Sequence, residues 1–168
     1  MYRKYFCLFL LFGSVLFAKA QKNWVSQKLS EKISISFPKK PVKASETSYG
    51  VKDSTGTVFA SSIVELAKAI NFEKAAFDSV VVEQDFANDF LEGFKPSFPK
   101  YIFDSVSISN LTGRTSYKFE GRDEQNKSSI YFIAIFIDGI AYSFTCILPD
   151  GKSVLDKNLF FKGIKITN

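Results

Sequence analysis

The stretch "IYFIAIFIDGIAYSFTCILP", residues 130–149, decides the fold of this chain. Asp138-Gly139 at its centre is the strongest short-range signal for a two-residue hairpin turn. Such a turn fixes the register, so that Ile137 lies opposite Ile140 and Tyr131 lies opposite Cys146. One face of the predicted hairpin then carries only apolar, aromatic and cysteine side chains, at positions 131, 133, 135, 137, 140, 142, 144 and 146.

The opposite face of the same hairpin has smaller and more polar side chains on its second strand, which contributes Ala141, Ser143 and Thr145. The first strand, residues 129–137, is almost wholly apolar, which is typical of a central strand covered on both sides. We therefore expect helices on both faces of a sheet that contains this hairpin.

Further strands are expected on both sides of this stretch. Residues 33–37, "ISISF", alternate strictly between apolar and polar, which predicts a half-buried strand. Strand patterns also cover residues 46–53, 57–66, 102–108, 115–120 and 164–166.

Two helices are expected. Asn71 is the predicted N-cap of a long helix to about Glu92, with Gly93 as its C-terminal stop, although the β-branched run at residues 80–82 favours a break into two. Ser153, three residues before Asp156, predicts the start of a short helix that ends near residue 161.

In this order of elements, the segments "ISISFPKKP" (33–41), "SISNLTGRTSYKFEG" (107–121), the hairpin stretch and "FFKGIKI" (160–166) resemble the PsbP-like superfamily, especially its little-characterised bacterial exported members. The resemblance implies a single α+β domain over residues 31–168, an antiparallel β-sheet flanked by helices in an α/β/α sandwich. It implies no catalytic residues and no cofactor. Plant members of this superfamily bind a photosynthetic complex, but no motif for that partner is present here.

Residues 1–20 have the pattern of a secretory signal peptide. A basic head, Met1 to Lys4, precedes thirteen largely apolar residues, and Ala18-Lys19-Ala20 supplies small residues where a signal peptidase cleaves. Cleavage would leave Gln21 at the mature N-terminus, followed by an N-terminal extension over residues 21–30. We expect an exported protein, periplasmic or secreted, without a stable membrane anchor; the alternative is an uncleaved N-terminal anchor.

The charge of the chain gives little support for nucleic-acid binding. The full sequence has 22 basic and 17 acidic residues, and removal of the leader leaves 19 basic residues against the same 17 acids. Nucleic-acid binding requires lysines and arginines clustered on one face. The densest basic group, Lys39-Lys40 with Lys43, lies beside two prolines in a predicted loop.

The composition also limits the available chemistry. The chain contains no histidine, so Ser-His-Asp and Cys-His catalytic sets are excluded, and Cys146 is the single cysteine outside the leader. No metal or cofactor site is predicted. We expect Cys146 to be a buried, inert thiol rather than a reactive one.

Four other residues are the remaining candidates for a functional site. Asp85 and Asp89 lie four apart on the predicted long helix, where they either bind a cation or face water opposite a phenylalanine stripe. Glu65 lies on an otherwise apolar predicted strand, and an exposed position at the edge of the sheet is the simpler explanation for it. Trp24, just past the cleavage site, has no structural explanation from sequence.

Three functional hypotheses follow. The first is a non-catalytic envelope or secreted module that binds a protein or surface partner. The second is a carrier of a small apolar ligand in a cavity between the sheet and the long helix, since 15 phenylalanines follow the leader and could line a pocket as well as a core. The third is an enzyme that uses carboxylates alone. An enclosed apolar cavity of several hundred Å³ would favour the carrier, and a filled core would favour the module.

Overall fold

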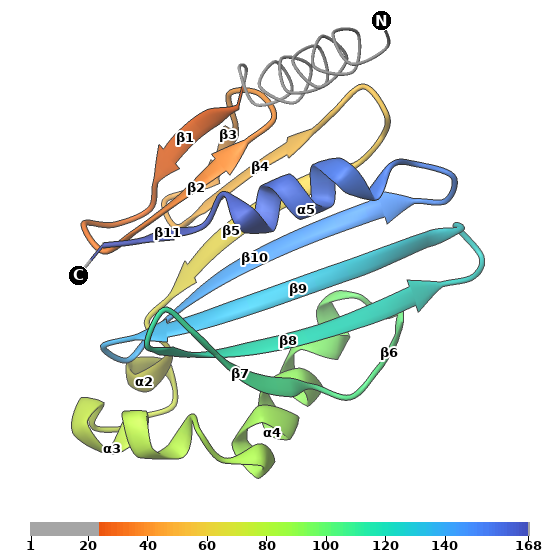
Figure 1. Ribbon diagram of the computed structural model, residues 1–168. Helices are drawn as coiled ribbons and strands as arrows, with labels where there is room; N and C mark the ends of the chain where they lie inside the picture. The colour runs from red at the N-terminus through yellow and green to blue at the C-terminus, as the bar shows by residue number, and fades with distance from the viewer. Residues whose placement is uncertain (1–23, 168) are drawn as a thin grey trace, which may run out of the picture.

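The computed structural model describes residues 24–167, which contain two antiparallel sheets and five helical segments (Figure 1). The large sheet has eight strands in the order β3-β4-β5-β10-β9-β8-β6, with β7 also paired to β8. The small sheet has the order β1-β2-β11. The α+β class and the antiparallel sheet are confirmed.

The strands are β1 Val25–Lys28, β2 Ile33–Phe37, β3 Val42–Ser45, β4 Ser48–Lys52, β5 Val58–Val64, β6 Ile102–Phe103, β7 Ser107–Leu111, β8 Arg114–Asp123, β9 Ser128–Ile137, β10 Ile140–Pro149 and β11 Lys165–Ile166. The helices are α2 Leu66–Ala69, α3 Lys74–Val80, α4 Gln84–Phe94, the 3₁₀ turn η1 Lys95–Ser97, and α5 Val154–Lys162.

The β9–β10 hairpin is the centre of the large sheet. Asp138 and Gly139 both have positive φ, 52° and 78°, which is the conformation of a type I′ turn. Ile137 lies opposite Ile140 and Tyr131 opposite Cys146, as the turn predicts. Both strands are largely buried because their two faces are covered by different layers.

The two faces of the large sheet pack against separate cores. On one face, α5 and the small sheet cover a core that includes Ile35, Phe144 and Phe160. On the other face, helices α2 to α4 cover a core that includes Phe77, Tyr117 and Phe136 (Figure 1). Helical elements therefore lie on both faces, as expected for an α/β/α sandwich.

The predicted long helix from Asn71 to Glu92 is wrong in its boundaries. Asn71 has a φ of 56° directly after α2, a left-handed position that asparagine tolerates, and the N-cap of α3 is Glu73. The helix breaks after α3 at the β-branched run. Gly93 lies inside α4, which ends at Phe94 before Pro96 of η1.

The N-terminal part of the described chain belongs to the folded domain. Residues 21–30 are predicted to be an extension, but residues 25–28 form β1 and pair with β2 along its length. Strand β3 is not predicted from sequence, and the expected strand over residues 102–108 is divided into β6 and the start of β7. The predicted signal peptide lies outside the described residues. Within residues 24–167, no helix is both long and apolar enough to cross a bilayer.

Candidate functional site

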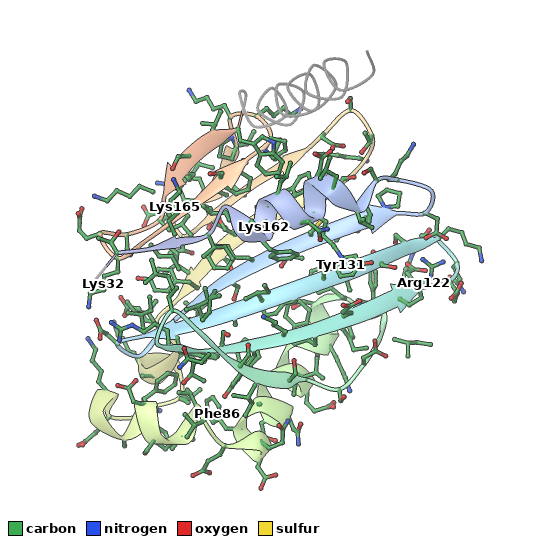
Figure 2. The ribbon with its side chains drawn as sticks, viewed as in Figure 1. Lys32, Phe86, Arg122, Tyr131, Lys162 and Lys165 are labelled. Atoms are coloured by element: carbon green, nitrogen blue, oxygen red, sulfur yellow. The ribbon has the colours of Figure 1, made fainter. Side chains whose placement is uncertain are left out.

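A cleft of about 810 Å³ lies between helix α4 and the part of the large sheet formed by β4, β5 and β10. Ligand pockets in proteins commonly have volumes of about 300–1,000 Å³. The cleft is on the face of the sheet that α2 to α4 cover, whereas Lys162 and Tyr131 lie on the opposite face, with α5 (Figure 2).

The floor of the cleft is made of small side chains from three neighbouring strands. Successive residues of a strand point to opposite faces, so every second residue of β4, β5 and β10 contributes to this floor. Ser62 of β5 lies directly opposite Ser48 of β4 and Ser143 of β10. The next row consists of Gly50, Ala60 and Thr145, and Ala141 and Val64 complete the floor.

The wall of the cleft is the phenylalanine stripe of α4, Phe86, Phe90 and Phe94. These residues are spaced by four, so they lie on one side of the helix. Phe86 lies between the helices and the sheet (Figure 2). Leu66 of α2 and Ile70, the C-cap of that helix, also line the cleft, as do Ser97 and Phe98 beyond the C-terminal end of α4.

The cleft exists because, on the face covered by α2 to α4, the side chains are large on β8 and β9 and small on β4, β5 and β10. Beneath α4, strands β8 and β9 carry large residues, and Phe90 packs edge-on against Tyr117 and Phe136. Phe94 contacts Phe132 with ring centroids 4.5 Å apart. On β4, β5 and β10 the residues at equivalent positions are glycine, alanine, serine and threonine, too short to reach the helix.

Three hydroxyl groups on the floor have no hydrogen-bond partner among the residues that the structure describes. No hydrogen bond in residues 24–167 engages the side chains of Ser62, Ser143 or Thr145, and all three line the cleft. Ser143 is only 8% exposed as a residue, but its hydroxyl is not fully buried; within residues 24–167, the fully buried hydroxyl without a partner is that of Ser61. The hydroxyl of Ser143 can therefore bond to water or to a ligand in the cleft.

The charges around the cleft are few. Asp89 of α4 is exposed and, among residues 24–167, is the single carboxylate that lines the cleft; no lysine or arginine of this part of the chain lines it. Asp85 lies one turn earlier on α4, is exposed and does not line the cleft. The two acids therefore do not form a joint site within the cleft.

Glu65 lies at the N-cap position of α2, directly after β5, and pairs with Lys68 at 3.3 Å. Its side chain is 65% exposed, so it lies in a solvated position rather than in a site. Trp24 packs edge-on against Phe59 with ring centroids 6.0 Å apart, on the α5 face of the sheet. Packing onto this core gives Trp24 the structural role that the sequence does not suggest.

Cys146 is fully buried among the aromatic residues of the α5 face and lies on the opposite side of the sheet from the cleft. Burial raises the pKa of its thiol to about 12. A thiol protonated at neutral pH is a poor nucleophile. Within residues 24–167, no group of three acidic or cysteine side chains is placed to hold a metal ion.

The cleft floor is not predicted from the sequence, although one part of it can be recognised there. The small residues on one face of the predicted hairpin, Ala141, Ser143 and Thr145, form the β10 part of the floor. The β5 part, Ala60 and Ser62, alternates in the same way, but its position beside β10 is not readable from the sequence.

The fold and the cleft together define an α/β/α sandwich of the PsbP type with an open apolar cleft on one face. No family model matches the chain, and no curated protein matches it significantly. Cyanobacterial PsbP (CyanoP) from Synechocystis sp. PCC 6803 superposes with a TM-score of 0.52 at 13% identity, over 86% of this chain and 93% of that one. This similarity supports the PsbP-like fold alone.

Two other solved structures are similar over most of this chain. A protein from Bacteroides thetaiotaomicron VPI-5482 has a TM-score of 0.48 at 10% identity and matches 84% of this chain. The match covers 48% of that protein, so this chain spans about half of its length. A protein of unknown function from Pseudomonas aeruginosa has a TM-score of 0.42 at 13% identity, over 76% of this chain and 84% of that one.

Proposed function

We propose that this protein is an exported, non-catalytic binding module that carries a small apolar ligand in the cleft between α4 and the sheet. The observation that carries the proposal is the mismatch between the phenylalanine wall and the small-residue floor, which leaves about 810 Å³ between them. The cleft is open, whereas the cavity expected for a carrier is enclosed. Its volume and apolar lining nevertheless favour a carrier over a module with a filled core.

The lining of the cleft also supports binding without catalysis. Glycoside hydrolases that use carboxylates alone hold two acids across a cleft, about 5–9.5 Å apart. Asp89 is the single acid that lines this cleft, and the thiol of Cys146 lies behind the sheet. The proposal assigns the residues of the cleft to ligand binding and no residue to a reaction step.

Binding of 1,6-diphenyl-1,3,5-hexatriene, a hydrocarbon that fluoresces in apolar surroundings, tests the proposal. We expect saturable binding at one site per chain. The variants Ser62→Leu and Ala60→Leu place a large side chain on the floor, and each should weaken binding by about tenfold or more, which corresponds to about 1.4 kcal/mol.

The matched control is Ser26→Leu, the same substitution at an exposed position of β1, away from the cleft. It should leave binding unchanged, and thermal unfolding should confirm that all variants fold. Absence of saturable binding, or equal binding by the floor variants and the wild type, would overturn the proposed function.

A further inference from the structure

We infer that the natural ligand is an uncharged amphiphile whose hydroxyl, ester or amide group rests on the serine row Ser48, Ser62 and Ser143. This inference deepens the proposed function and rests on it. The serine row crosses three adjacent strands, since Ser62 pairs with both other residues in the register of the sheet.

The hydroxyls of this row supply the first argument. Side chains directly opposite each other in an antiparallel pair have Cβ atoms about 4.5–5.5 Å apart, so the row presents closely spaced donors and acceptors. The hydroxyl of Ser48 is hydrogen-bonded to that of Ser45, whereas the hydroxyls of Ser62 and Ser143 have no hydrogen-bond partner within residues 24–167. Ser143 is more than nine-tenths buried as a residue and lines the cleft, so a ligand atom there can bond to a hydroxyl that has no partner within residues 24–167.

The position of the row supplies the second argument. Apolar surface surrounds it, with Ala141 and Val64 on one side, Gly50 and Ala60 on the other, and the phenylalanines of α4 across the cleft. A ligand that fits must therefore be apolar over most of its length and carry a polar group at one place.

The charges argue for an uncharged polar group. No lysine or arginine of the described chain, residues 24–167, lines the cleft, so a carboxylate or phosphate head would lack a counter-ion from this part of the protein. Asp89 at the rim would repel an anion. Transfer of an unpaired charge into a poorly hydrated cleft is much more costly than transfer of a hydroxyl that gains hydrogen bonds.

Displacement of diphenylhexatriene by two ligands of equal chain length tests the inference. At pH 8, 1-decanol should displace the probe, and decanoate should do so at least about tenfold less effectively. In the double variant Ser62→Ala/Ser143→Ala, decanol should bind roughly fivefold or more weakly, because two hydrogen bonds are lost, while the affinity for the hydrocarbon probe stays within about twofold.

Two further measurements separate a ligand-binding role from a structural one. Without ligand, the double variant should be as stable as the wild type or more stable, because unpaired hydroxyls are removed. The control Ser26→Ala should not change decanol binding. If decanoate binds as tightly as decanol, or if the double variant binds decanol normally, the inference is overturned; if the probe itself does not bind, the proposed function fails first.

Discussion

The side chain of Cys146 has no exposure to solvent, and this burial determines its chemistry. Desolvation raises the pKa of the thiol from 9.0 to about 12, and the charge of Lys157 opposes this shift only in part. The residue therefore packs as a small apolar side chain rather than acting as a nucleophile.

The raised pKa of Cys146 predicts a specific loss of stability in alkali. Below about pH 9 the thiol is protonated in both the folded and the unfolded states, so the free energy of unfolding does not depend on this group. Between pH 9 and 12 only the unfolded chain releases the proton, and each pH unit should lower the free energy of unfolding by about 1.4 kcal/mol. Urea unfolding at pH 8, 9 and 10 measures this effect.

The variant Cys146→Ala provides the control, because it lacks the titrating group. Its stability should fall less steeply than that of the wild type between pH 9 and 10. Parallel pH profiles for the two proteins would show that the thiol is not desolvated. A thiol reagent should also label wild-type Cys146 slowly in native buffer and rapidly in denaturant.

Helix α4 has one glycine near its C-terminal end, Gly93, which lines the cleft but has no close packing that requires glycine. A Cβ atom at Gly93 would meet nothing within 4 Å. Gly93→Ala should therefore stabilise the protein by about 0.5–1 kcal/mol, because alanine favours the helix and restricts the unfolded chain. The measurement is the midpoint of urea unfolding.

The contrasting variant is Gly121→Ala in β8. A Cβ atom there would lie 2.7 Å from the ring of Phe103, so the strand and the ring would have to move apart. Overpacking of this kind costs about 1–3 kcal/mol. A loss of stability in Gly93→Ala similar to that in Gly121→Ala would contradict the packing described for α4.

At this scale, the elements that were predicted well are those with strong local signals. The turn at Asp138-Gly139 determines its own register, and Ser153 accepts a hydrogen bond from the backbone N–H of Leu155 at the start of α5. The helices before α4 were predicted less well. Asn71 is compatible with both a helix start and a left-handed helix end, and the choice depends on how α2 meets the sheet.

At the scale of the whole molecule, the cleft depends on contacts that are remote in sequence. Ser62 and Ser143 become neighbours only because β5 pairs with β10. Composition and alternation identify both strands, but neither property specifies their order in the sheet. For this reason the hairpin face with small side chains can be recognised from the sequence, whereas the serine row across three strands cannot.

The predicted export of the protein can be tested directly. If the sequence pattern is a cleaved leader, protein recovered from the exporting host should have an intact mass that corresponds to a chain beginning at Gln21, because Ala18 and Ala20 match the small residues of a signal-peptidase site. Ala20→Arg should block cleavage and cause the full-length chain to accumulate. A wild-type mass that includes residues 1–20 would refute the predicted leader.

The pairing of β2 with β11 joins the two ends of the described chain. Thr167 donates its backbone N–H to the carbonyl of Lys32 at 2.8 Å, and Phe37 packs against Phe160 with ring centroids 5.4 Å apart. During synthesis, β2 leaves the ribosome long before the residues that cover it, by roughly ten seconds at ordinary elongation rates. The apolar face of β2 therefore stays uncovered during this time, and the native domain is completed only after α5 and β11 have emerged.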